Sequence, residues 1–405
     1  MLHNKTMIAR LAGFLFMVLA GASALAQSNL IARLRPGANP TQLAQQFGVT
    51  FREKAPGGPF FLFFVPVGVD PHAVQLAMSA HADVAWVEDD PEISMPEQVG
   101  GGKGSSVAVV NDRGRAYTQN TGALAQIGFS PSFTAVIGRT VKVAVLDTGI
   151  TPDCAILWAK VVGKYNAVEN TLPYDVKRGT DSDGDGVFDE GFGHGTFVAG
   201  LVDQMSPNSK LVIVRVADSD GNSSAWRLVK GIAFAVYNGA EVANISLGTQ
   251  GAIPALTDVF EWARLGGMLI VAAAGNGNLN SIDNPAGLTK AVAVTGLDAF
   301  DHKAVFANYR NKVESCAPAT GLKSYGPYGR LMIWSGTSFA SPLVAGSIAE
   351  CLRHKAGKVD ASALFDKVKL SGVSVDDLNP NYRGELGLKL WIPDLWAKIQ
   401  SLPLR

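Results

Sequence analysis

From residue 141 to the carboxyl terminus, runs of consecutive apolar residues alternate with longer stretches of helical composition. The apolar runs are rich in Val, Ile, Leu and Ala and cover residues 141–146, 211–216, 241–247, 268–274 and 291–297. Helices are predicted near residues 195–203, 226–237, 255–265 and 339–355. Strands that are apolar at every position are buried on both faces. The pattern therefore predicts an α/β domain with a parallel β-sheet flanked by helices on both faces.

Residues 27–98 show a different rhythm of shorter elements. Strands are predicted at 29–34, 60–67 and 84–87, and helices at 40–47 and 71–82. Such a mixture predicts a small α+β domain that is separate from the larger one. The glycine-rich residues 99–106 then predict a flexible junction. Residues 107–405 form the larger domain.

Residues 1–26 are typical of a signal peptide, because basic residues precede an apolar run at 11–20 and small residues follow it. The alternative is a membrane anchor, but a spanning helix needs roughly 20 apolar residues. We therefore expect a secreted or periplasmic protein with no membrane span after processing. In an oxidising compartment Cys154, Cys316 and Cys351 would form one disulfide and leave one thiol, or all three would stay buried as thiols.

Composition and charge exclude several classes of function. Of the 405 residues, 47% are hydrophobic and 17% are charged, which allows a sizeable core. Basic and acidic residues balance at 35 each, so no overall field attracts nucleic acid and no nucleic-acid partner is expected. The segment Gly102-Lys103-Gly104 lacks the Ser or Thr that a phosphate-binding loop carries after its lysine. We expect no organic cofactor.

Four polar residues lie at positions where catalytic side chains are commonly found. Asp147 ends one apolar strand and Asn276 follows another, and ligands bind at the carboxyl ends of parallel strands. His194 lies between two glycines at the start of a helix, and Ser338 opens the helix of small residues at 339–355. A serine hydroxyl is a weak nucleophile unless the chain also supplies a base, a group that orients the base and an oxyanion site.

These four residues could together catalyse acyl transfer. Ser338 would attack a carbonyl carbon while His194 takes the hydroxyl proton, and Asp147 would hold the imidazole in the required tautomer. The oxyanion would lie between the Ser338 backbone N–H and the Asn276 side-chain amide. Each residue has a structural alternative, since a serine at a helix start is usually a cap, Asp-Thr-Gly is usually a turn, and a histidine between glycines is often structural.

The order Asp147, His194, Asn276, Ser338 resembles that of the subtilisin-like serine peptidases. The resemblance covers the chain from about residue 107 onward, and it departs at Phe197, where many relatives carry a second histidine. It implies a serine-type endopeptidase that hydrolyses peptide bonds by a Ser/His/Asp triad through an acyl-enzyme. It also implies a set of substrate-binding residues, whose alternative is strand ends packed in the core. The set is Ser246, Leu247, Gly248, Ala273, Ala274 and Gly275.

Residues 27–98 resemble, more weakly, the propeptide of the same family. That domain assists folding and inhibits the enzyme by laying its tail in the active site. The resemblance implies an autoprocessed zymogen, inhibited by its own propeptide and cut between Ile93 and Ser106. We expect a monomer. Two other classes stay open, namely a catalytically inactive peptide-binding relative and a calcium-dependent structural or interaction protein.

An acidic loop precedes the histidine. Its carboxylates at alternate positions around a glycine match the opening of an oxygen-ligand calcium loop, although the twelfth position is Phe192 rather than Glu. Relatives commonly bind calcium, so a structural Ca²⁺ is expected here, with a solvated acidic turn as the alternative. The candidate ligands are Asp181, Asp183, Asp185, Asp189 and Glu190.

Overall fold

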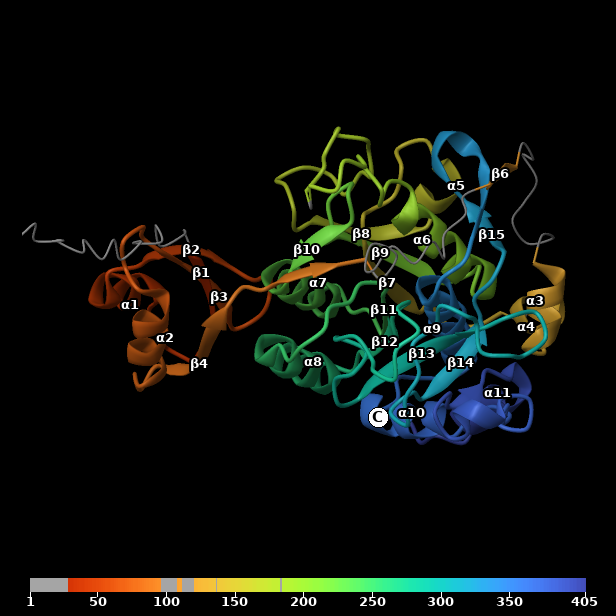
Figure 1. Ribbon diagram of the computed structural model, residues 1–405. Helices are drawn as coiled ribbons and strands as arrows, with labels where there is room; N and C mark the ends of the chain where they lie inside the picture. Colours follow the sequence, from red (N-terminus) through yellow and green to blue (C-terminus); the bar gives the residue numbers. More distant parts are fainter. Residues whose placement is uncertain (1–27, 96–107, 111–119, 136, 183) are drawn as a thin grey trace, which may run out of the picture.

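The larger domain is built on one sheet of eight strands, in the order β17-β14-β13-β12-β11-β7-β9-β8 (Figure 1). The computed structural model describes residues 28–95, 108–110, 120–135, 137–182 and 184–405, so the predicted signal peptide and junction lie outside it. Neighbouring strands are parallel throughout, which confirms the predicted parallel sheet. The bounds are β7 (Lys142–Asp147), β8 (Val161–Asn166), β9 (Lys210–Arg215), β11 (Val242–Ile245), β12 (Leu269–Ala273), β13 (Ala291–Leu297), β14 (Ser315–Pro318) and β17 (Leu388–Lys389).

Both faces of this sheet are buried, as the uninterrupted apolar runs predict. Along β7, Val143 and Val145 belong to one core while Ala144 and Leu146 belong to the other, because successive side chains of a strand point to opposite faces. The first core is covered chiefly by α6 (His194–Met205) and α9 (Thr337–Arg353). The second is covered chiefly by α7 (Ala225–Tyr237) and α8 (Pro254–Leu265).

Shorter elements complete the larger domain. Strands β6 (Ala108–Val110), β15 (Leu322–Tyr325) and β16 (Leu331–Trp334) form a small antiparallel sheet, and β10 (Asn222–Ser224) precedes α7. The remaining helices are α3 (Thr121–Gln126), α4 (Pro131–Thr134), α5 (Ala155–Trp158), η2 (Pro327–Gly329), α10 (Ala361–Lys369), η3 (Pro380–Tyr382) and α11 (Ile392–Gln400). No helix within the described ranges has both the length and the apolar character needed to cross a bilayer.

The amino-terminal residues form a domain of their own. Its four strands, β1 (Ser28–Leu34), β2 (Thr50–Lys54), β3 (Phe60–Val65) and β4 (Val84–Asp89), make an antiparallel sheet in the order β2-β3-β1-β4. Helices α1 (Pro40–Phe47) and α2 (Pro71–Ser79) each start with a proline after an Asn or Asp cap. No strand was predicted at β2, because no residue of this strand is buried and its apolar signal is correspondingly weak.

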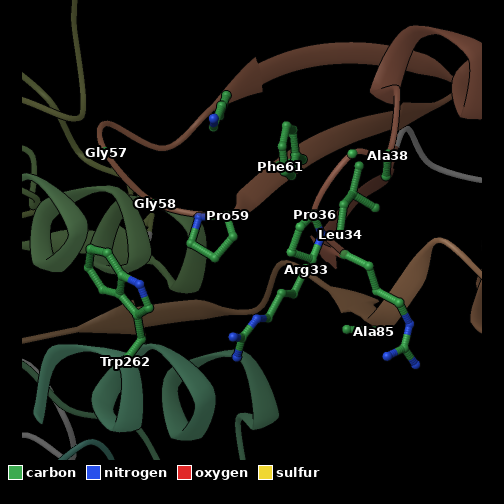
Figure 2. Close-up of a pocket in the computed structure, with 13 residues that line it drawn as sticks. Arg33, Leu34, Pro36, Ala38, Gly57, Gly58, Pro59, Phe61, Ala85 and Trp262 are labelled. Atoms are coloured by element: carbon green, nitrogen blue, oxygen red, sulfur yellow. The ribbon is translucent and has the colours of Figure 1, made fainter. Parts of the chain in front are cut away.

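The sheet of the amino-terminal domain packs against α7 and α8. Ile31, Phe60 and Leu62 point away from the domain's own core and join the second core of the larger domain. At the rim of this interface a pocket of about 780 Å³ opens between the turn at Gly57 and Trp262 of α8 (Figure 2). The Arg33–Asp258 ion pair at 2.5 Å is partly exposed. Water and salt therefore reach part of the contact between the domains.

Candidate active site

Asp147 and His194 form a buried pair at the carboxyl edge of the sheet. Asp147 is the last residue of β7, and its Oδ1 accepts a hydrogen bond from the Thr148 backbone N–H at 2.8 Å. The same oxygen lies 2.7 Å from Nδ1 of His194. Both side chains are at most 1% exposed, so their attraction is little screened by solvent. The structure thus brings together the predicted base and the residue predicted to orient it.

The backbone at Gly193 determines how His194 enters its helix. Gly193 is the N-cap of α6 and has φ of 91°, in the left-handed region that favours glycine. A Cβ at this position would also come within 2.7 Å of the Pro327 ring. The turn therefore requires glycine, and it sets His194 as the first residue of the helix.

An aromatic cluster surrounds the imidazole. The rings of Trp334 and Phe339 lie 5.5 and 5.3 Å from the His194 ring, measured between centroids. Phe197 packs against the same two rings, at 5.7 and 4.7 Å. At the position where many relatives carry a second histidine, this chain therefore has a side chain that helps to build the apolar wall around His194.

Ser338 is the second residue of α9, so the helix begins two residues earlier than the predicted start at residue 339. Its Oγ lies 3.5 Å from the backbone oxygen of Ser246. Pro342 lies inside α9, whereas the predicted start at residue 339 would place it in the first turn, and it has no N–H to donate to the Ser338 carbonyl four residues earlier. That carbonyl instead accepts a hydrogen bond from Ser246 Oγ at 2.9 Å. The carbonyl that Pro342 leaves without a helical partner is therefore satisfied by Ser246, a predicted substrate-binding residue.

Asn276 is fixed next to Ser338 through Thr337. Oδ1 of Asn276 accepts hydrogen bonds from the backbone N–H and the hydroxyl of Thr337, both at 2.9 Å. Since Oδ1 is engaged in this way, Nδ2 is the end of the amide that can donate to another group. The predicted oxyanion donor therefore comes from the loop after β12 and lies beside the start of α9.

The predicted substrate-binding residues are all buried, and one of them pairs with another strand. Gly248 exchanges two backbone hydrogen bonds with Ser94, at 3.3 and 2.8 Å. Ser94 ends β5 (Glu92–Ser94), which is also antiparallel to β10. The tail of the amino-terminal domain is thus held as a strand between β10 and Gly248 (Figure 1).

Two apolar side chains of this tail are buried in the larger domain. Ile93 is 2% exposed and belongs to the second core. Met95 is 1% exposed, and its backbone N–H donates to the oxygen of Gly221 at 3.2 Å. A Cβ on Gly221 would overlap the Met95 side chain, and a Cβ on Gly191 would come within 3.0 Å of it. The burial of Ile93 and Met95 was not predicted from the sequence, although two apolar residues at alternate positions of a strand are its signal.

The acidic loop uses several of its carboxylates as hydrogen-bond acceptors for its own backbone. Asp181 accepts from the backbone N–H groups of Gly184 and Gly186, at 2.8 and 3.2 Å. Asp189 accepts from the backbone of Arg178 and Gly179 and from the hydroxyl of Ser219, at 2.9, 2.9 and 2.6 Å.

The remaining predicted calcium ligands give no further support for a metal site. Asp183 lies outside the described residues, and the backbone N–H of Glu190 donates to Asp220. Within the described part of the chain no group of three or more His, Cys, Asp or Glu side chains is arranged to hold a metal ion. Asp189 therefore anchors the loop through its hydrogen bonds.

The three cysteines are all buried as free thiols, so the disulfide alternative is not formed. Burial raises the pKa of the Cys154 thiol to about 12, and it raises the pKa values of the Cys316 and Cys351 thiols well above their ordinary range. Thiols of such high pKa are poor nucleophiles at neutral pH. The cysteines therefore take no part in the chemistry of the site.

Comparisons with known proteins agree with this geometry. The model of the Subtilase family matches residues 138–365. Subtilisin DY from Bacillus licheniformis is 32% identical over 253 residues, which are 59% of this chain and 86% of that protein. Thermitase from Thermoactinomyces vulgaris is 32% identical over 219 residues, which are 52% of this chain and 74% of that protein.

Solved structures show the same fold. Fervidolysin from Fervidobacterium pennivorans, a keratinolytic enzyme related to subtilisin, superposes with a TM-score of 0.70 at 18% identity, over 95% of this chain and 62% of that one. A cold adapted subtilisin-like serine proteinase superposes with a TM-score of 0.56 at 26% identity, over 67% of this chain and 97% of that one. The chain therefore belongs to the subtilase family and is a serine-type endopeptidase, a hydrolase of peptide bonds.

Proposed function

We propose that this subtilase is an exported endopeptidase, made as an inactive zymogen, that cuts peptide bonds with a triad of Ser338, His194 and Asp147. The observation that carries the proposal is the 2.7 Å contact between His194 Nδ1 and Asp147 Oδ1, next to the loop and helix that carry Asn276 and Ser338. A carboxylate that accepts from Nδ1 leaves Nε2 as the basic nitrogen of the ring.

The reaction then proceeds through two acyl-transfer steps. Ser338 Oγ bonds to the substrate carbonyl carbon while its proton passes to His194 Nε2, and the carbonyl electron pair moves onto oxygen. The Ser338 N–H and the Asn276 amide donate to this oxyanion. As the carbon–nitrogen bond breaks, His194 gives its proton to the leaving amine, which leaves an acyl-enzyme. A water molecule then repeats the sequence and releases the acid.

Residues 27–98 are, in this proposal, a propeptide that inhibits the enzyme domain at 107–405. Two observations support this. Strand β5 lies where an extended peptide would add, paired on both sides through backbone hydrogen bonds. His194 and Ser338 are both 0% exposed while the amino-terminal domain is docked. Residues 1–26 are proposed to direct export, and the cut is proposed to fall between residues 93 and 106.

The tail also supports a proposal about substrate preference. Ile93 and Met95 are buried two positions apart, whereas Ser94 between them is only half-buried and is held by its backbone. A peptide bound in the same way would be selected at those two alternate positions. We infer a preference for a branched apolar residue at the first position and for a long, flexible apolar residue at the second.

A structural Ca²⁺ in the acidic loop remains a proposal, since the family binds such ions and Asp181 and Asp185 face the same short turn. Oxygen ligands of this kind suit a hard cation, whose binding would order the segment that leads to His194. We expect a chelator to lower the melting temperature of the enzyme, and Asp181→Asn to reduce that effect. An unchanged melting temperature with chelator would refute a bound structural ion.

The triad is tested by labelling with a fluorophosphonate probe. Wild type and Ser338→Ala are each purified, and their intact masses are read before and after incubation. We expect labelling of the wild type alone, together with loss of the amino-terminal region from the wild type alone. A folded wild-type enzyme with its propeptide removed that takes no label would contradict the proposed triad and favour an inactive peptide-binding relative.

A further inference from the structure

The helix that carries His194 has no cap of its own at its start. Gly193, the N-cap of α6, has no side chain that could accept from the first backbone N–H groups. Two distant side chains take this role instead. Asp175 Oδ2 accepts from the Gly193 N–H at 2.7 Å, and Thr148 Oγ1 accepts from the Gly195 N–H at 3.0 Å. The two bonds fix the backbone immediately before and immediately after His194.

The same two side chains are bonded to each other, and the backbone of Thr148 is bonded to the carboxylate of the triad. Thr148 Oγ1 donates to Asp175 Oδ2 at 2.8 Å, while the Thr148 backbone N–H donates to Asp147 Oδ1. The Asp175 backbone N–H in turn donates to the Ile150 oxygen at 3.0 Å. Asp175 is therefore attached to the turn that follows Asp147 as well as to the helix that carries His194.

We propose that Asp175 is a positioning residue of the active site, a second carboxylate that fixes the backbone before His194 directly and the backbone after it through Thr148, and that supplies negative charge near the Asp147–His194 pair. This inference rests on the proposed role of His194 as the base. It concerns a residue that carries no motif in the sequence and that lies outside the triad. Asp175 bonds to Thr148, which follows Asp147, and to Gly193, which precedes His194, so it links the two segments whose relative placement the reaction requires.

The charge of Asp175 follows from its surroundings. The side chain is 0% exposed, and burial raises its pKa to about 7. The hydrogen bonds from Thr148 and Gly193 and the positive charge of Arg215 on β9 act in the opposite direction, while the negative charge of Asp147 on β7 adds to the rise. Arg215 also pairs with Glu169 at 3.3 Å. Asp175 therefore exchanges its proton near neutral pH, and above that range it adds one negative charge near the base.

The test compares two substitutions in the mature enzyme. Both hydrogen bonds from Gly193 and Thr148 end on the same oxygen, so Asp175→Asn can keep both while losing the charge, whereas Asp175→Ala loses both. We expect Asp175→Ala to lower kcat by about 100-fold with little change in KM, because the base is misplaced. We expect Asp175→Asn to keep most of kcat and to move the acid limb of the kcat/KM profile to lower pH by about half a unit.

The matched control is Asp203→Asn, which removes a buried carboxylate from the same helix, where it pairs with Lys160 at a distance from His194. We expect this variant to lower the melting temperature and to leave the pH profile unchanged. A merely structural Asp175 would behave in the same way. Folded Asp175→Ala with the wild-type kcat and profile would overturn the proposal, and if that variant does not fold, an unshifted profile of Asp175→Asn would overturn it.

A second measurement separates this inference from the proposed triad. In the Ser338→Ala background, proton NMR follows the imidazole of His194, one of three histidines after residue 106. We expect Asp175→Asn to lower the pKa of His194 there, whether or not the enzyme turns over. If the wild type takes no fluorophosphonate label, only the proposed triad is refuted. If the pKa of His194 is unchanged in Asp175→Asn, only the role of Asp175 is refuted.

Discussion

Truncating Ile93 should release the amino-terminal domain from the active site. The side chain is 2% exposed and packs into the second core of the enzyme domain, outside the core of its own domain. Ile93→Ala removes three buried carbon atoms, each worth about 0.8 kcal/mol, so docking should weaken by about 2.4 kcal/mol. That energy corresponds to a roughly 50-fold higher inhibition constant.

The assay adds residues 28–95 to the mature enzyme and follows hydrolysis of a peptide substrate over time. Ser94→Ala is the matched control, because the Ser94 side chain is half-buried and its two bonds to Gly248 come from the backbone. We expect an inhibition constant within about twofold of wild type for the control. Circular dichroism of each added domain verifies that both variants fold equally. Equal inhibition by the two variants would refute the reasoning that Ile93 anchors the tail.

Three further outcomes follow from the site and from the contact between the domains. Burial raises the pKa of Glu88 to about 7, and its carboxylate accepts from the backbone N–H of Ala255 at the start of α8. Docking therefore takes up a proton. Titration calorimetry that adds residues 28–95 to a Ser338→Ala enzyme produced without residues 1–106 should show weaker docking as pH rises from about 4.5 to about 7, and a constant affinity above that. Glu88→Gln should flatten this dependence, and a wild-type affinity that rises with pH would contradict it. Asn276→Ala should lower kcat by about 100- to 1000-fold, and it should also lower the melting temperature because Thr337 loses its acceptor. A loss confined to KM would argue against an oxyanion donor.

Five strands of the sheet and the catalytic motifs were predictable because their signals are local, whereas β8, β14 and β17 were not predicted. The predicted strands are mostly apolar, and Asp147 and Asn276 come at the ends of two of them. Glycines flanking His194 and small residues around Ser338 mark tight turns that any reader of the sequence can find. The resemblance to the subtilase family, now confirmed, rested on these same segments.

What escaped prediction depends on partners far away in the chain. Asp175 looks like any loop aspartate, and only its bonds to Thr148 and Gly193, 27 and 18 residues away, make it part of the site. Met95 and Gly221 meet across more than a hundred residues. The position of Pro342 was misjudged because α9 starts earlier than its apolar pattern, on the two polar residues before residue 339.

The strand β5 has a consequence for when activity begins. While the chain is uncut, β5 is covalently linked to the enzyme domain. Such a linked segment competes with substrate at an effective concentration on the order of millimolar. Its backbone bonds to β10 and Gly248 then exclude any dilute substrate. Under the proposed processing, with a cut between residues 93 and 106, the same strand would be held only by its own affinity. Inhibition would then depend on concentration, so that dilution of the processed enzyme would itself release its activity.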